Sequence, residues 1–168
     1  MEFKYIILTR GEKCKVDSNL FKLLNFYKWR LARWGGKYYA VRNVGRKEVS
    51  MHRFIMDSLD NNLKLDVDHI NHKGLDNRKI NLRLCSRSSN LANSIKRKVL
   101  NGKNTSCKFK GVYLSKDQKR IKKWFSQLTH NYKHYFLGRF ASQKEAALAY
   151  NKKAKELFGD YAHLNKVK

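Results

Sequence analysis

Acidic side chains are scarce in this sequence, and their shortage is the most pronounced feature of its composition. The 168 residues include 13 Asp and Glu against 38 Lys and Arg, which gives a formal net charge of +25. This excess is far beyond what solubility requires, and a polyanion is the partner that best accounts for it. Nucleic acid is therefore the expected partner, although a membrane surface or an acidic protein also attracts positive charge.

Cysteine, proline and long apolar runs are few or missing. The three cysteines, Cys14, Cys85 and Cys107, are odd in number and far apart, which argues against a disulfide framework and a CxxC zinc site. No apolar run approaches the length of a membrane-spanning helix, and the first ten residues lack a signal-peptide pattern. We therefore expect a soluble, cytoplasmic protein without a membrane partner or structural zinc. Proline is absent altogether, for no physical reason that the sequence shows.

The charge distribution changes along the chain, which is long enough for two small domains. Residues 1–94 carry 19 basic and 9 acidic residues, whereas residues 95–168 carry 19 and 4. Between these halves lies a polar, basic stretch without helical or strand periodicity. We expect an α+β fold with one domain at 1–95, a linker at 96–109 and a second domain at 110–168.

The first half predicts a small β-rich region. Short runs rich in aromatic and β-branched residues, separated by glycines, indicate a small antiparallel sheet. Apolar residues at helical spacing predict two short helices. The expected strands are Tyr5–Thr9, Lys28–Ala32, Tyr38–Arg42 and Lys47–Val49, and the expected helices are Asp17–Phe26, with Asp17 or Ser18 as its cap, and Ser50–Leu59.

Asp, His and Asn residues gather in the segment from Leu65 to Ser94. The pattern predicts a strand at Val67–Ile70, a polar loop, a strand at Asn81–Cys85 and a helix at Ser89–Lys98 behind Ser86 or Ser88, which together form a ββα unit. Phosphodiester hydrolysis needs a base that deprotonates water and a cation that neutralises charge on the phosphate and the leaving oxygen. Asp68 and Asn90 offer hard oxygen ligands for one Mg²⁺-type ion, and His69 is the candidate base.

This segment resembles the phage-type HNH homing endonuclease family over residues 50–94. The resemblance is carried by Met51-His52-Arg53-Phe54, Val67-Asp68-His69-Ile70 and Asn81-Leu82-Arg83, and by the order of Asp68, His69, Asn81 and Asn90. It implies a ββα-metal core at about 65–95 in which Asp68 and Asn90 bind one Mg²⁺ or Mn²⁺ ion, His69 is the general base and Asn81 braces the loop. Asn90 stands where some members have His, which favours a hard metal over catalytic zinc.

Simpler interpretations of single residues remain. A lone Asp-His pair is usually only a polar turn, but four matching positions in a ββα context are hard to reconcile with coincidence. His72 is expected to be a loop residue facing DNA or solvent, and His52 to be structural. Asn93 either packs within its helix, contacts phosphate or binds the metal.

The second half predicts a three-stranded sheet packed on one helix, the economical fold for about 55 residues. The expected strands are Lys110–Ser115, Lys123–Thr129 and Lys133–Arg139. The helix that follows starts with a capping box, Ser142 and Glu145, and Gly159 is placed to end it. Its apolar stripe consists of Ala147, Tyr150, Ala154 and Leu157.

Residues 110–165 resemble the DNA-binding domain of plant ethylene-response factors. The matching residues are Gly111-Val112-Tyr113, Trp124, Phe136-Leu137-Gly138-Arg139-Phe140, Glu145-Ala146-Ala147-Leu148-Ala149-Tyr150 and Ala162-His163-Leu164-Asn165. The resemblance implies that one sheet face enters the major groove of double-stranded DNA, although this face has fewer arginines than the plant pattern.

Period-two alternation assigns the two faces of this sheet. Val112, Trp124, Leu128, Tyr135 and Leu137 are expected to pack on the helix. The other face and the first hairpin loop are expected to contact DNA bases and phosphates, respectively. The expected DNA-binding residues are Lys110, Tyr113, Ser115, Phe125, Gln127, Thr129, His134 and Phe136 on the sheet, and Lys116, Lys119, Arg120, Lys122 and Lys123 in the loop.

The sequence thus predicts a site-specific DNA endonuclease of a bacterial or phage-infected cell. The chain holds one Asp-His motif and no dimerisation signature, so we expect a monomer that nicks one strand. The alternative is a non-catalytic DNA-binding regulator that retains the nuclease hairpin in degenerate form.

Overall fold

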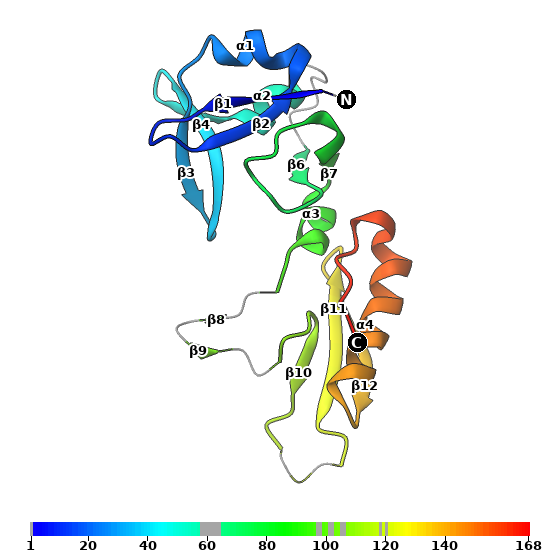
Figure 1. Ribbon diagram of the computed structural model, residues 1–168. Helices are drawn as coiled ribbons and strands as arrows, with labels where there is room; N and C mark the ends of the chain where they lie inside the picture. The colour runs from blue at the N-terminus through cyan, green and yellow to red at the C-terminus, as the bar shows by residue number, and fades with distance from the viewer. Residues whose placement is uncertain are drawn as a thin grey trace. The chain divides into compact units, whose positions relative to one another are not determined.

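The chain forms two compact units, Met1–Arg87 and Ser88–Lys168, in the computed structural model (Figure 1). The structure describes residues 2–57, 65–96, 99–100, 103–104, 107–117, 119 and 121–168. Each unit has its own hydrophobic core, and both mix helices with small antiparallel sheets, as the α+β prediction required. None of the helices within these residues is long and apolar enough to cross a membrane.

The first unit is built from three antiparallel sheets and short helices. A hairpin, a three-stranded sheet and a second hairpin follow one another along the chain. The strands are β1 (Phe3–Ile7), β2 (Lys13–Asp17), β3 (Arg30–Trp34), β4 (Lys37–Val44), β5 (Lys47–Ser50), β6 (Asp66–His69) and β7 (Leu82–Cys85). The helices are α1 (Phe21–Asn25), α2 (Met51–Asp57) and the 3₁₀ turns Ser18–Leu20 and Lys79–Asn81.

One core holds this first unit together. Alternate residues of the first hairpin point inward, so that Ile6, Cys14 and Val16 are almost completely buried. They pack in the same cluster as Trp29 and Leu24, and the Trp29 indole N–H donates to the Leu24 carbonyl at 2.8 Å. Burial of these side chains supplies the main stabilisation of the unit.

The predicted helix Asp17–Phe26 is present as the 3₁₀ turn Ser18–Leu20 followed directly by α1, with Asp17 at the N-cap position and Phe26 at the C-cap. Asp17 is the last residue of β2, and the α-helical part begins only at Phe21. The Asp17 side chain does not cap this helix. The strand β2, which the sequence patterns did not predict, pairs with β1 and buries Cys14 and Val16.

The remaining strand predictions are confirmed with shifts of a few residues at their ends, as is usual for sequence patterns. β3, β4 and β5 form the expected antiparallel sheet, and α2 covers the first part of the predicted Ser50–Leu59 helix. The predicted end of that helix, from residue 58, lies outside the described residues.

The predicted strand–loop–strand–helix order is present around the candidate site. β6 pairs with β7 so that Asp68 lies opposite Arg83 and His69 opposite Leu82. The helix that follows, α3, runs over Arg87–Asn93 and is shorter than the predicted Ser89–Lys98. Ser94–Lys96 are not helical, and residues 97–98 lie outside the described part of the chain.

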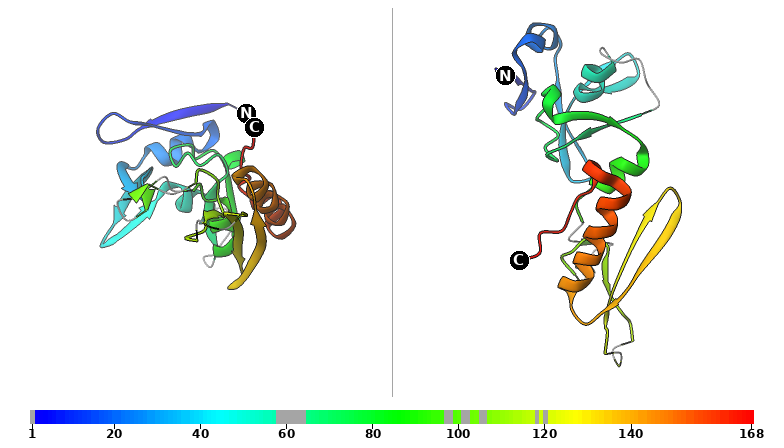
Figure 2. Two further views of the ribbon diagram at one scale, coloured as in Figure 1. Left: turned by 90° about the horizontal axis from the view of Figure 1, so that it is seen from below. Right: turned by 90° about the vertical axis from the view of Figure 1, so that its right-hand side faces the viewer.

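The second unit consists of a three-stranded antiparallel sheet with one long helix on one face (Figure 2). The strands β10 (Val112–Leu114), β11 (Trp124–His130) and β12 (Lys133–Phe140) are adjacent in chain order. The helix α4 spans Gln143–Phe158 and is followed by a 3₁₀ turn at Gly159–Tyr161. Within the expected linker, β8 (Val99–Leu100) pairs with β9 (Lys103–Asn104).

The ends of α4 agree with the prediction. The Ser142 hydroxyl accepts from the Glu145 backbone N–H at 3.1 Å and donates to the Glu145 carboxylate at 3.1 Å. Gly159 ends the helix with a φ of +52°, which an L side chain adopts only at a cost. The Ser142 cap, its contact with Glu145 and the glycine stop are therefore confirmed.

The inner face of the sheet also agrees with the alternation. Val112 and Leu128 are buried, while Trp124, Tyr135 and Leu137 pack against the same clusters as the α4 side chains. Cys107 and Phe109, which the prediction assigned to the linker, are buried in this core as well.

Candidate functional site

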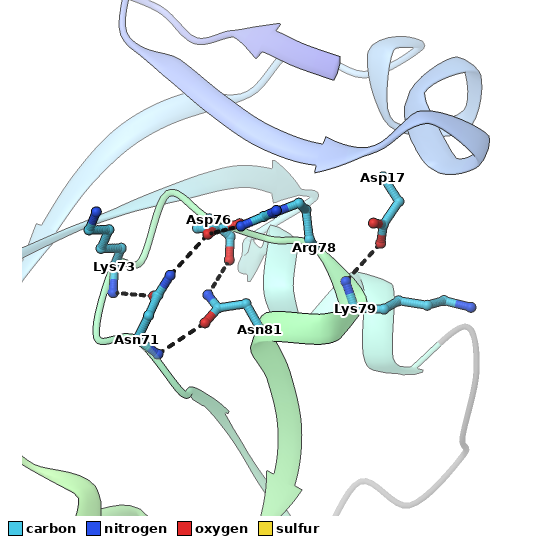
Figure 3. A network of polar contacts seen from close by, with 7 residues as sticks. All are labelled: Asp17, Asn71, Lys73, Asp76, Arg78, Lys79 and Asn81. Atoms are coloured by element: carbon cyan, nitrogen blue, oxygen red, sulfur yellow. Dashed lines mark hydrogen bonds and ion pairs between the residues drawn. The ribbon is translucent and has the colours of Figure 1, made fainter. Parts of the chain in front are cut away.

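A polar loop joins β6 to β7, and its own side chains hold it in shape (Figure 3). Asn81 is buried at the end of this loop. Its Oδ1 accepts from the Asn71 backbone N–H at 3.0 Å, and its Nδ2 donates to the Asp76 carbonyl at 2.7 Å. The backbone N–H of Ile70 donates to the Asn81 carbonyl at 2.9 Å. The Asn81 side chain thus links the beginning of the loop, at Asn71, to its middle, at Asp76.

Asp76 organises the middle of the same loop. Arg78 donates to its two carboxylate oxygens at 2.8 and 2.7 Å, and Asn71 Nδ2 donates to Oδ2 at 2.9 Å. The paired hydrogen bonds from Arg78 hold the pKa of Asp76 below its ordinary value. Next to it, the Lys79 backbone N–H donates to Asp17 Oδ2 at 2.7 Å, which fixes the loop to β2. The loop is therefore bound to itself and to the first hairpin.

Asp68, the predicted metal ligand, lies in β6 and is buried. Arg83, its partner in β7, donates from Nε at 3.1 Å and from Nη2 at 2.9 Å, and both bonds end on Oδ2. The neighbouring acid, Asp66, pairs with Arg53 at 3.2 Å and with Arg87 at 3.3 Å. The hairpin therefore holds two acidic side chains, each with its charge compensated by arginine.

His69, the predicted base, is buried in the next position of β6. Its Nε2 lies 3.1 Å from Oδ1 of Asn77, a side chain with no exposed surface. Burial lowers the pKa of His69 below its ordinary value, and the hydrogen bond to Asn77 and the charge of Asp68 only partly oppose this effect. The imidazole is consequently neutral at pH 7 and able to accept a proton.

Aromatic rings surround His69 on the side of β4 and α2. The rings of His52 and His69 meet at a centroid distance of 4.9 Å, and the Tyr39 ring lies 5.6 Å from the first and 5.9 Å from the second. Gly74 of the loop lies against Tyr39, because a Cβ there would come within 2.8 Å of ring carbons. Burial lowers the pKa of His52 to about 3, so this ring is neutral too.

The last predicted site residue, Asn90, lies in α3 within the second unit and is half-buried. Asn93 of the same helix is buried, and His72 is a half-buried loop residue with a φ of +62°. The β6–β7 hairpin and its loop thus bring together Asp68, His69 and Asn81. Within the described residues, no group of three or more His, Cys, Asp or Glu side chains is arranged to hold a metal.

Aromatic side chains cover the outer face of the β10–β12 sheet. Tyr113 and Phe125 stack at a centroid distance of 5.4 Å, and Phe125 meets Phe136 at 6.4 Å. The Arg139 guanidinium lies 5.6 Å from the Phe125 ring. Phe136 is 61% exposed. On the adjoining strands, Thr129 Oγ1 lies 2.9 Å from His134 Nδ1, and Gln127 is exposed.

Two residues that we expected on this outer face lie elsewhere. Lys110 is half-buried, and its ammonium donates to the carbonyls of Leu91, Ala92 and Ser94 at 3.1, 2.6 and 2.8 Å. A cation at a helix C-terminus complements the carbonyls left without helical partners, which explains its place at the end of α3. Burial lowers the pKa of Lys110 to about 8. Ser115, one residue beyond β10, is only 8% exposed, and its backbone N–H donates to the Lys123 carbonyl at 2.8 Å.

The loop between β10 and β11 presents its lysines to solvent. Lys116, Lys119, Lys122 and Lys123 are all exposed. Arg120, predicted to act with them, lies outside the described residues.

The sequence interpretation did not assign His52, Tyr39 or Asn77 to the surroundings of the base. His52 and Asn77 were visible as polar residues on either side of the Asp-His pair, and their nearness to His69 follows from the packing of α2 and the loop. Tyr39 lies 30 residues before His69, and no local pattern connects the two.

One relative clarifies the family. The chain is 30% identical over 162 residues to an uncharacterized HNH endonuclease of Acanthamoeba polyphaga mimivirus, and this match covers 94% of the chain and 77% of the relative. No protein-family model matches the chain, and no solved structure is significantly similar to it. The identity and coverage place the chain among the nucleases of the HNH type. It belongs to the HNH endonuclease family.

Proposed function

We propose that this protein is a DNA endonuclease that hydrolyses a phosphodiester bond with His69 as the general base and one divalent metal ion. The observation that carries the proposal is the β6–β7 hairpin. It holds a buried, neutral imidazole next to a buried carboxylate, with the connecting loop braced by Asn81. A neutral imidazole next to a carboxylate suits deprotonation of water near an anionic substrate.

His69 has the properties of a base because its surroundings are largely fixed. The Nε2 edge of the ring contacts Asn77, and the rings of His52 and Tyr39 pack against the imidazole. A base whose orientation is set in advance loses less entropy when the reaction begins. In the proposed reaction, His69 takes a proton from water, the resulting hydroxide forms a bond to phosphorus, and the bond from phosphorus to the leaving oxygen of the DNA strand breaks.

The donor chemistry of Asp68 fits a hard divalent cation. A carboxylate offers two hard oxygens, and Arg83 holds the carboxylate of Asp68 in the hairpin. We assign Asp68 and Asn90 as the ligands of one Mg²⁺ or Mn²⁺ ion, the second on the basis of the sequence motif. When bound, the ion would neutralise charge on the phosphate and on the leaving oxygen. Arg83 would hold Asp68 in place through its two hydrogen bonds.

The second unit supplies the affinity for double-stranded DNA in this proposal. Its outer sheet face carries three aromatic rings in contact, and the adjoining loop carries exposed lysines. Lysines that pair with phosphates give salt-dependent affinity without reading sequence, whereas the face of a sheet can contact base edges in the major groove. The ethylene-response-factor resemblance of residues 110–165 supports the same division of roles.

A single motif in a single chain favours cleavage of one strand by a monomer. A double-strand break needs two sites related by an approximate two-fold axis, which a homodimer would provide. The chain contains one Asp-His pair, at Asp68 and His69. The expected product is therefore a nick.

Incubation of supercoiled plasmid with the protein, in Mg²⁺ and in excess EDTA, tests the proposal. The plasmid carries a randomised insert, because the target sequence is unknown. Open circles that form only with metal support the endonuclease. DNA that is retained in a gel shift but remains uncut at every metal concentration would instead identify a DNA-binding regulator.

A further inference from the structure

We propose that Asn77 is a positioning residue that keeps the His69 proton on Nε2 and so makes Nδ1 the nitrogen that accepts a proton from water. This inference rests on the proposed role of His69 as the base. It adds an atom-level assignment, and it extends the functional site to the first hairpin of the chain.

The contact between the two side chains defines the tautomer. Asn77 Oδ1 is a carbonyl oxygen and accepts only, so the imidazole nitrogen 3.1 Å away must be the donor. A neutral imidazole carries one proton. When that proton is on Nε2, the basic lone pair is on Nδ1.

Asn77 itself is held in place by its backbone. Its N–H donates to the Lys15 carbonyl at 2.8 Å, and the Lys15 N–H donates to the Leu75 carbonyl at 2.8 Å. These two bonds attach the loop to β2 by its main chain. The side chain of Asn77 has no exposed surface, so it cannot turn toward water.

Cys14 sets which end of the Asn77 amide faces the histidine. Asn77 Nδ2 donates to Cys14 Sγ at 2.9 Å, while Cys14 Sγ donates to Met51 Sδ at 3.5 Å. Cys14 is fully buried, and burial raises the pKa of its thiol to about 12, so the sulfur keeps its proton. A thiol that donates to Met51 has its lone pairs left to accept, and it therefore binds the NH₂ end of the amide. The oxygen end is then directed at His69.

The result is an ordered chain of donors and acceptors from α2 to the base. It runs from Met51 through Cys14 and Asn77 to His69, and it joins residues that are far apart in sequence. Hydrogen-bond partners of this kind fix the tautomer and orientation of a functional histidine, and their loss typically costs about 10- to 100-fold in activity. We expect a loss of this size in kcat, with the KM for DNA unchanged, when Asn77 is replaced by a side chain that cannot accept.

Nitrogen NMR of the ¹⁵N-histidine-labelled full chain at neutral pH tests the tautomer directly and needs no variant. The inference predicts that His69 Nε2 has the chemical shift of a protonated ring nitrogen and Nδ1 that of an unprotonated one. The opposite pattern, or an average of the two, would overturn it. Because this readout does not depend on cleavage, it separates failure of the tautomer assignment from failure of the proposed function.

Three variants and a matched control extend the test. Asn77→Leu should give averaged His69 shifts and the 10- to 100-fold loss in kcat, whereas Asn77→Asp, which keeps an acceptor oxygen, should retain the Nε2–H pattern. Cys14→Ala should act in the same direction as Asn77→Leu but more weakly, since it removes only the orientation of the amide. Lys73→Ala is the matched control, because it changes an exposed side chain of the same loop and keeps the backbone N–H that donates to Asn71. An Asn77→Leu protein that folds and keeps both the wild-type shifts and the wild-type kcat would contradict the inference.

Discussion

The loop between β6 and β7 and the outer face of the β10–β12 sheet are both polar or aromatic regions with proposed roles, yet they are built in opposite ways. In the loop, Asp76, Asn77 and Asn81 are buried, and their side chains bond to one another or to the backbone. On the sheet, Tyr113, Phe136 and their basic neighbours are exposed. A reacting group requires fixed geometry, whereas a surface that binds a long polyanion requires access.

This contrast predicts that substitutions in the two regions will affect different quantities, the rate of cleavage in one case and the affinity for DNA in the other. Changes at the hairpin should lower the rate of cleavage with little effect on affinity. Changes on the sheet should lower affinity and its salt dependence, and they should leave the rate of the bound complex unchanged.

The largest expected effect comes from His69→Ala. Removal of a general base typically costs about 10² to 10⁴ in rate, while DNA affinity should stay within twofold because the side chain is buried. Single-turnover cleavage and gel shift measure the two quantities. His72→Asn is the control, since Asn tolerates the positive φ of that position. A severalfold loss alone, or equal losses in both variants, would remove His69 from the role of base.

Substitution of the proposed metal ligands is expected to have the second-largest effect on activity. We expect Asp68→Ala and Asn90→Ala to shift the Mg²⁺ or Mn²⁺ activation curve to higher concentration or to abolish activity. Asp66→Asn serves as the comparison, because Asp66 pairs with Arg53 and Arg87 and is not a proposed ligand. Unchanged metal titrations in the first two variants would exclude both residues from the site.

On the sheet, Phe136→Ala should weaken DNA binding by about 1–3 kcal/mol, the range of a lost stacking or base-edge contact. The rate of the saturated enzyme should not change. Tyr132→Asn is the matched exposed aromatic, since Tyr132 lies at the tip of the β11–β12 hairpin with a φ of +64°. If both variants bind equally well, the aromatic face is not the DNA surface.

The buried histidines predict a pH dependence of stability that is confined to the first unit. Burial lowers the pKa of His52 from 6.5 to about 3, so the unfolded chain binds a proton in this interval and the folded chain does not. Stability is therefore complete above pH 6.5 and falls as the pH drops toward 3, by about 2 kcal/mol at pH 5. Urea unfolding from pH 7 to pH 5 measures the loss. It should be smaller in His52→Gln, and an identical slope in both proteins would contradict the assignment.

Local patterns in the sequence were sufficient for the elements whose stabilisation is local. The β6–β7 hairpin and the Ser142–Glu145 capping box follow from residues within a few positions of one another. The strand β2 was not predicted, because it forms only when β1 pairs with it. Local patterns cannot report such pairings.

Around the candidate site, too, the residues linked by local spacing could be predicted and those linked by tertiary packing could not. The Asp-His pair and Asn81 were predictable, since their spacing alone carries the motif. The contact between Cys14 and Asn77 joins residues 63 positions apart, and burial of a thiol gives no pattern in the sequence. Lys110 was misplaced for a similar reason. Strand alternation puts it on the outer face, but its ammonium donates to carbonyls at the C-terminal end of α3, where a cation is favoured.

The central claim is that the β6–β7 hairpin hydrolyses DNA, and sequencing of the ends produced from a randomised supercoiled plasmid library tests it most directly. The account predicts Mg²⁺-dependent ends on one strand only, near a shared sequence, and their loss in His69→Ala with binding retained. The absence of metal-dependent ends in a sample that binds DNA would contradict the claim. Paired ends on both strands would contradict the monomeric nick alone.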